Sequence, residues 1–159
     1  MRLSILAAAI LAIPPLATQA GESMQATGRT VSYRTAAEVL ERDAANKPIK
    51  GTIERVGITL HEAGPASGTY SQVRIVATWR LAGKSGVYSG TLHRTFDEGE
   101  IQDIAFKGRF GKGRAEGTYE CVGGTGKYAN ATCRGTYTST SFPNGMASNR
   151  WSGTIRFAK

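Results

Sequence analysis

Cysteine and histidine are scarce in this chain of 159 residues, which contains two of each. Proteins that hold zinc and related metals often place their ligands at a paired spacing, C-x-x-C or H-x-x-x-H. This spacing is found neither for the two cysteines, Cys121 and Cys133, nor for the two histidines, His61 and His93. The acidic stretch 96–103 lacks the spacing of an EF-hand loop, so we interpret it as a solvated turn rather than a Ca²⁺ site. We therefore expect no metal site.

The motifs of common nucleotide-binding and hydrolytic enzymes are also absent. The stretch CVGGTGKYANATC contains Gly126-Lys127, but a P-loop would have Gly where Cys121 stands and Ser or Thr where Tyr128 stands. The glycine-rich stretch 108–117 is not followed by the strand–helix unit that a dinucleotide site needs. No Gly-x-Ser-x-Gly nucleophile elbow occurs. These absences predict a protein with no cofactor and no recognisable nucleophile.

Long hydrophobic runs are limited to the start of the chain. Leu3 to Ile13 is apolar, follows Arg2, and ends in two prolines and a series of small residues up to Ala20. This order is typical of a secretory signal peptide, and the run is shorter than the roughly 20 residues that span a bilayer. We expect a signal peptide over 1–20, with a retained anchor as the alternative. The mature chain, 21–159, would then be a single secreted or periplasmic domain with no stable membrane span.

The formal net charge of +8 at pH 7 favours anionic surroundings, such as an envelope surface, an acidic ligand or nucleic acid. Export argues against nucleic acid as a partner. Because lysine and arginine are spread along the chain, general solubility is an alternative explanation of the charge. Exported proteins meet an oxidising environment, so Cys121 and Cys133 are expected to form a disulfide, with two free buried thiols as the alternative.

Most of the chain has the pattern of consecutive antiparallel strands separated by turn signals. In 73–81, for example, the residues at odd positions are all apolar, whereas Arg74, Thr78 and Arg80 lie on the opposite face. A Gly-Thr pair before a bulky apolar residue recurs at Gly68, Gly90, Gly117, Gly135 and Gly153. Glycine inside a strand marks a bulge or a close approach, which closed barrels use to bend. We count eight strands, at 30–34, 52–60, 73–81, 87–96, 101–110, 118–122, 134–142 and 150–158.

Eight strands suffice to close an up-and-down β-barrel, so an all-β barrel is the predicted fold, with a sandwich as the alternative. One short helix is expected before the barrel, from Ala36 to Ala45. Thr35 and Glu38 have the spacing of a capping box. Ala36, Val39 and Leu40 form a short apolar face at helical spacing.

Titratable side chains are the candidates for acid–base chemistry. His93 lies opposite the apolar face of 87–96, so it would be a general acid–base if that polar face lines the barrel, and a surface histidine if it faces water. Glu62 and Glu120 are the other candidates. Aromatic residues of the strands are candidate walls of a ligand pocket, with core packing as the alternative role: Trp79, Tyr88, Phe106 and Tyr119.

The segment Gly123-Gly124-Thr125-Gly126-Lys127-Tyr128, followed by Ala131, resembles the Gly-Gly-Thr-Gly-Lys-aromatic signature of the allene oxide cyclase-like and dirigent-like barrels. The resemblance implies an eight-stranded antiparallel barrel, often exported and often a homo-oligomer. It also implies that Gly123, Gly124 and Gly126 form a turn with one helical turn, and that Tyr128 packs over a barrel end. Cys133 replaces the last glycine of the signature, which fits a disulfide with Cys121.

The sequence is consistent with three functions. The first is an exported barrel that binds a small molecule of largely apolar or anionic character. The second is a cofactor-free isomerase, cyclase or lyase resembling allene oxide cyclase, although no catalytic residue of that family can be carried over. The third is an envelope or host-facing interaction protein that uses its basic surface. We favour binding, because no nucleophile, metal or cofactor constellation is recognisable.

Overall fold

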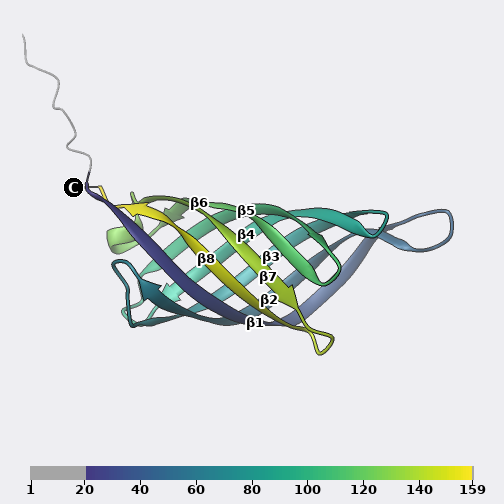
Figure 1. Cartoon of the computed structure of the whole chain (residues 1–159), viewed down its shortest axis with the longest axis horizontal. Coiled ribbons are helices and arrows are strands. Elements are labelled where there is room, and N and C mark those ends of the chain that lie inside the picture. The colour runs from purple at the N-terminus through teal and green to yellow at the C-terminus, as the bar shows by residue number, and fades with distance from the viewer. Residues whose placement is uncertain (1–20, 159) are drawn as a thin grey trace, which may run out of the picture.

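The computed structural model describes residues 21–158, and the predicted signal peptide lies outside them. Eight antiparallel strands form one closed barrel in the order in which they occur in the chain (Figure 1). This confirms the barrel and rules out the sandwich. The strands are β1 (Ser23–Arg42), β2 (Pro48–Ala63), β3 (Tyr70–Ala82), β4 (Ser85–Phe96), β5 (Ile101–Gly111), β6 (Arg114–Gly124), β7 (Thr132–Ser141) and β8 (Met146–Arg156), with a 3₁₀ helix, η1 (Gly126–Tyr128), between β6 and β7.

The antiparallel order gives the barrel two ends with different connections. At one end, β2–β3, β4–β5 and β6–β7 are joined, and β1 begins beside the end of β8; we call this the plug end. At the other, the mouth end, β1–β2, β3–β4, β5–β6 and β7–β8 are joined. Both ends of the described chain therefore lie at the plug end. Among the residues described, no helix is long and apolar enough to cross a membrane.

Strand alternation divides the side chains between the barrel interior and the outer surface. In β3, Val73, Ile75 and Ala77 are buried, whereas the residues between them are exposed. In β4, the faces containing Tyr88 and His93 point to opposite sides in the same way. The period of two follows from the pleat of the strand, which places successive side chains on opposite faces.

The helix predicted at Ala36–Ala45 is wrong, because β1 continues as a strand to Arg42. Its partner is β2, with pairs such as Ala37↔Ile53 and Val39↔Gly51, and two irregularities in register fall within this part. A lone helix of that length is marginal in water, whereas the extended chain gains ladder hydrogen bonds to β2. The local helical signal is therefore overridden by a partner that is distant in sequence.

This part of the sheet forms an arm that projects beyond the barrel. The arm consists of residues 34–50. β1 pairs with β8 only as far as Tyr33, so beyond it β1 pairs with β2 alone. Because β2 pairs with β3 only from Lys50 onward, the tip of the arm is a two-stranded hairpin. In Figure 1 this arm extends past the other turns of the mouth end. Nearly all of its side chains are exposed.

The strand glycines of the repeated Gly-Thr pairs make room for aromatic rings inside the barrel. Gly135 and Gly153 are paired across β7 and β8, and a Cβ at either position would lie 2.5 Å from the Tyr119 hydroxyl. A Cβ at Gly117 would likewise lie 2.5 Å from the Tyr137 hydroxyl. No register shift occurs at these glycines, so they allow a close approach rather than form a bulge. Gly68 differs, because it lies in the β2–β3 connection with a positive φ.

The plug end is closed by the segment between the two cysteines. Gly126 has a φ of 54°, which a glycine adopts readily, and η1 then directs Tyr128 over the barrel end. Tyr128 is 2% exposed and stacks on Phe96, with ring centroids 4.6 Å apart. The disulfide between Cys121 and Cys133, with Cα atoms 4.9 Å apart, confirms the predicted pairing and joins β6 to β7 at this end.

Candidate functional site

A cavity of about 640 Å³ occupies the barrel interior. Its lining runs from Ala66 at the plug end to Lys84 and Lys112 in the mouth-end turns. The plug end is filled by the buried cluster around Phe96 and Tyr128, whereas the lining residues at the mouth end belong to exposed turns. The cavity therefore opens at the mouth end, and its size is that of a typical small-molecule site.

The lining is largely apolar and aromatic, and it includes all four aromatic residues proposed as pocket walls: Trp79, Tyr88, Phe106 and Tyr119. Two of them, Tyr88 and Phe106, contact each other with ring centroids 6.0 Å apart. Tyr119 meets Trp151 edge-on at 6.3 Å. Burial raises the pKa of both Tyr88 and Tyr119, so both hydroxyls stay neutral at physiological pH.

Arg94 is the residue that distinguishes this interior from an ordinary aromatic core. It projects inward from β4, is only 6% exposed and lines the cavity. Its Nη1 donates to the amide oxygen of Gln102 at 2.7 Å, and its guanidinium carbon lies 5.1 Å from the centre of the Trp151 ring. None of the described carboxylates forms an ion pair with it, and its buried Nε has no hydrogen-bond partner.

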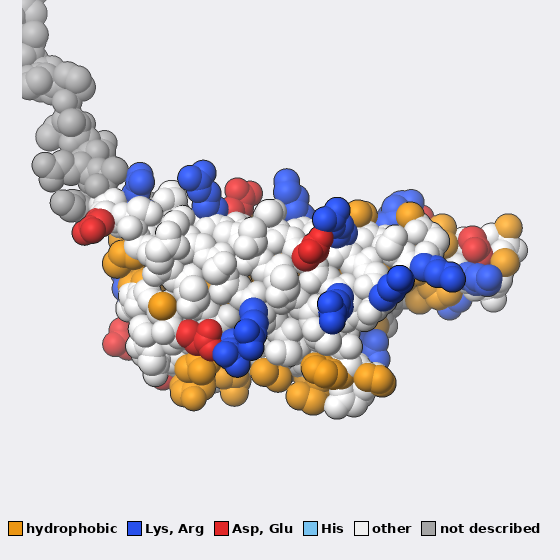
Figure 2. Space-filling model, viewed as in Figure 1, with side chains coloured by type: hydrophobic (Ala, Val, Ile, Leu, Met, Phe, Trp, Pro, Cys, Tyr) orange, Lys and Arg blue, Asp and Glu red, His pale blue; other side chains and the backbone are white. Residues whose placement is uncertain are grey.

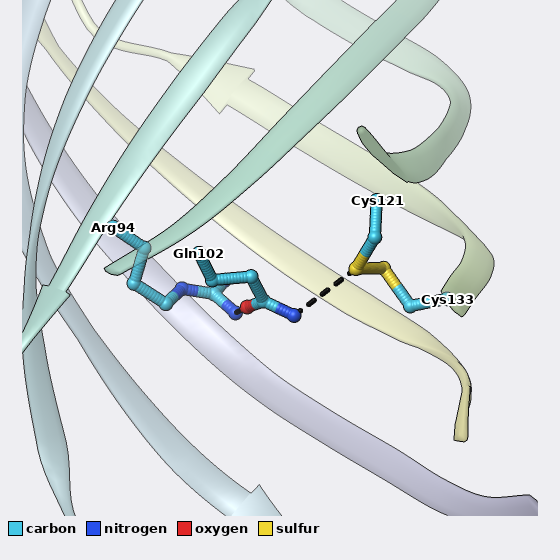
Figure 3. The surroundings of a disulfide bond; sticks show 4 residues. All are labelled: Arg94, Gln102, Cys121 and Cys133. Carbon is cyan, nitrogen blue, oxygen red and sulfur yellow. Dashed lines mark hydrogen bonds between the residues drawn. A yellow bond between two sulfur atoms is a disulfide. The ribbon is translucent and has the colours of Figure 1, made fainter. Parts of the chain in front are cut away.

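Gln102 connects Arg94 to the disulfide, as Figure 3 shows. While its amide oxygen accepts from Arg94, its Nε2 donates to the Sγ of Cys121 at 3.1 Å. The Gln102 amide is thus held by hydrogen bonds at both its oxygen and its nitrogen. Because the disulfide is fixed to two strands, this chain orients the guanidinium from the barrel wall.

Burial lowers the pKa of Arg94 to about 10, which still leaves the side chain charged at neutral pH. An unpaired buried charge is costly, so proteins usually pair such groups or expose them. Three other lining residues also have a buried polar atom without a hydrogen-bond partner, Ser32 Oγ, Tyr137 Oη and Trp151 Nε1, and the Trp151 ring lies against the guanidinium. The cavity therefore combines an apolar wall with unused hydrogen-bond donors and a cation.

His61 lies in the same interior, on β2, and is 4% exposed. Its Nε2 is 2.9 Å from the hydroxyl of Ser71, and its ring contacts Phe96 and Trp151. Burial, and then the positive charge of Arg94, lower the pKa of His61 to about 3. The imidazole is therefore neutral across the physiological range and offers polarity without charge.

The predicted acid–base residues lie outside the cavity. His93 is on the outer surface of β4, where its Nδ1 is 2.7 Å from Asp103. Glu62 pairs with Arg29 on the outer surface at 2.6 Å, and Glu120 is exposed on β6. The structure thus separates these three residues from the four aromatic ones.

The charged residues that do line the cavity are all basic. Arg55 projects inward near the mouth and donates to the backbone oxygen of Gly145, and Lys84, Lys112 and Arg114 surround the opening. Aspartate and glutamate are absent from the lining within residues 21–158. The same part of the chain contains no group of three or more His, Cys, Asp or Glu side chains placed to hold a metal ion.

Sequence reasoning missed Arg94 and Gln102, although the sequence contains a signal for the first. In 87–96, Arg94 has the parity of Leu92 and Phe96, so it belongs to the apolar face. A cation in that register marks an inward-facing charge. Gln102 becomes notable only when its pairing with Arg94 across β4 and β5 is known.

Comparisons with known proteins do not assign this site. No protein-family model matches the chain, and no curated protein matches it.

Proposed function

We propose that this protein binds a small organic acid, with the acidic group at Arg94 and an apolar body along the aromatic wall of the barrel. The observation that carries the proposal is the buried guanidinium, which faces a cavity and has no carboxylate partner among the described residues. A carboxylate from a ligand would supply the missing counter-charge. Charge-assisted hydrogen bonds to arginine are among the stronger contacts available to such a group.

The composition of the cavity supports binding over acid–base catalysis. Its only histidine, His61, is a weak base because its pKa is lowered to about 3, and efficient general bases have pKa values near the working pH. The apolar wall contributes by burying the body of the ligand, at about 25 cal/mol per Å² of apolar surface removed from water. The basic residues of the mouth add long-range attraction for an anion.

We also propose that the protein is exported and belongs to the allene oxide cyclase-like and dirigent-like barrels. The disulfide is compatible with an oxidising compartment outside the cytoplasm. Support for the family comes from the glycine-rich segment before Tyr128 and from the eight-stranded barrel. Fold alone does not transfer an activity, so the proposed ligand rests on Arg94 and not on the family.

The test compares an acid with its neutral analogue. Fluorescent dansyl-undecanoate is bound to the purified protein and then displaced by dodecanoate or by dodecanol, which differ only in the head group. We expect the acid to displace the probe at concentrations about tenfold lower or better, as a charged hydrogen bond of about 1.5–3 kcal/mol implies. Arg94→Met should abolish this preference, while its circular dichroism spectrum stays that of a folded barrel.

Arg109→Met is the matched control, because it removes an arginine that is paired with Glu116 on the outer surface. This variant should keep the preference for the acid. Equal displacement by acid and alcohol in the unaltered protein, or an unchanged preference in Arg94→Met, would overturn the proposal.

A further inference from the structure

Positive charge is concentrated in the connections of the mouth end. Three of the four mouth-end connections contain a lysine, and two of these have an arginine at the adjoining strand end. The basic residues are Arg42, Lys47, Lys84, Lys112 and Arg114, and the only acidic residue of these connections is Asp43. The five cations form no ion pair with the carboxylates of residues 21–158. Asp43 instead accepts hydrogen bonds from the backbone of its own turn.

The plug end has the opposite balance. Its β4–β5 connection contains Asp97, Glu98 and Glu100. Among residues 21–158, the cations of its connections and adjoining strand ends are Lys127, which pairs with Glu100 at 2.8 Å, and Arg156. Charge spread for solubility alone would not separate along the barrel axis in this way. The separation indicates that the mouth end, and not the whole molecule, faces a negative partner.

Exposed apolar side chains accompany these cations. Phe142, in the β7–β8 connection, is 46% exposed, and Val39 and Leu40 are exposed on the arm. Figure 2 shows Lys and Arg side chains gathered along the arm and the adjoining end of the barrel, with apolar groups between them. A bilayer interface with anionic lipids attracts this combination, because it takes up apolar groups beneath a negatively charged surface.

The ligand chemistry leads to the same partner, in an argument that rests on the proposed function. An organic acid with an apolar body partitions into membranes, and the cavity that would hold it opens between Lys84, Lys112 and Arg114. We propose that the mouth end binds the surface of an anionic phospholipid bilayer, so that the cavity opens toward the lipid from which its ligand comes.

An anionic bilayer fits better than an acidic protein as the partner. The cations belong to separate turns around the opening of the cavity. They do not line a groove in which a peptide could lie. Attraction to a charged surface needs no fixed geometry of individual side chains and contributes roughly fivefold in affinity for each Lys or Arg near it.

The experiment measures co-sedimentation of the full chain with vesicles, without any added ligand. Vesicles of phosphatidylcholine alone are compared with vesicles that also contain phosphatidylglycerol, at low and high salt. We expect binding only to the anionic vesicles, weakening as salt shortens the Debye length below about 10 Å. Reversing Lys84, Lys112 and Arg114 together to Glu should weaken binding about a hundredfold. Phe142→Ser should weaken it by a smaller factor while leaving the salt dependence unchanged.

A wall variant serves as the matched control, with Lys107, Arg134 and Arg150 reversed to Glu. These residues are exposed on the outer faces of β5, β7 and β8. Because three cations are again replaced by glutamate, the change in net charge is the same as in the mouth variant. The wall variant should retain binding within about fivefold of the unaltered protein. Equal losses in the two variants, or equal binding to the two kinds of vesicle, would overturn the proposal.

Failure of docking and failure of ligand binding give different results. Arg94→Met should lose its preference for dodecanoate in vesicle-free solution and still sediment with anionic vesicles. If the unaltered protein shows no acid preference but binds anionic vesicles through its mouth, the proposed ligand is wrong and the membrane surface stands. If the unaltered protein prefers the acid but does not bind vesicles, the proposed ligand is supported and the proposed membrane binding is wrong.

Discussion

Arg94 donates from Nη1 to the amide oxygen of Gln102 at 2.7 Å inside the barrel, and this pair replaces the ion pair that a buried arginine would normally have. A neutral amide satisfies one donor but leaves the charge uncompensated. The free energy lost in this way is recoverable when an anion enters the cavity.

Replacing both partners by apolar residues should stabilise the ligand-free protein. In Arg94→Met with Gln102→Leu, the buried charge and its amide disappear together, so neither substitution leaves the other residue without its hydrogen-bond partner. We expect the free energy of unfolding in urea to rise by about 1–4 kcal/mol. Arg94→Met alone should gain less, because it leaves the Gln102 oxygen without a donor. A double variant less stable than the unaltered protein would show that Arg94 is already well compensated.

His61 should make folding stability depend on pH below neutrality. Its pKa is lowered from 6.5 to about 3 in the folded protein, so between these values the unfolded chain takes up a proton that the folded barrel does not. Its stabilising contribution is complete above pH 6.5 and is lost as the pH falls toward 3, at about 1.4 kcal/mol per pH unit.

The measurement is urea unfolding of the unaltered protein and His61→Gln at several pH values in this range. The carboxylates titrate in both proteins, so the difference between the two curves isolates His61. Parallel curves would show that the folded histidine is protonated normally.

The disulfide should contribute about 3 kcal/mol to the free energy of unfolding, since it closes a loop with a sequence separation of 12 residues. Replacing Cys121 and Cys133 together by Ser should lower the urea midpoint accordingly. Thiol labelling of the denatured, unreduced protein should detect no free cysteine. Labelling of two thiols per chain would contradict the bond.

A side chain at Gly153 should disturb the aromatic wall of the cavity. In Gly153→Ala the new methyl group would lie 2.5 Å from the Tyr119 hydroxyl, and it would also meet the backbone of β7. We expect a loss of about 1–3 kcal/mol in the free energy of unfolding, as for other overpacked cores. Gly123→Ala is the matched control, because its nearest atom would be at 3.6 Å. Similar losses in both would show that crowding of the new methyl group against Tyr119 and β7 is not the cause.

Much of the barrel is readable from the sequence, because strand alternation and turn residues are local features. The predicted alternation of 73–81 and the turn signals between strands match β3 and the connections observed. The error at Ala36–Ala45 has a different origin. Alanine, glutamate and leucine favour a helix locally, and only the pairing of this stretch with β2 makes it a strand.

The candidate site was less accessible to sequence reasoning. His93 has the residue type expected of a catalytic group, yet its parity places it on the outer surface beside Asp103. Arg94, its neighbour in sequence, faces inward, and its contact with Gln102 requires the register between β4 and β5. Residue type alone therefore pointed to the wrong side of the strand.

The sequence by itself determined the strand periodicity, the positions of the glycines within strands and the pair of cysteines available to cross-link, because each depends on neighbours along the chain or on a choice of one partner. Only the tertiary structure decided that the strands close into a barrel with a plugged end and a basic mouth. It also decided that an arginine is enclosed without a counter-charge. Those properties depend on which strands meet, and the free energy of a charge depends on what surrounds it in space.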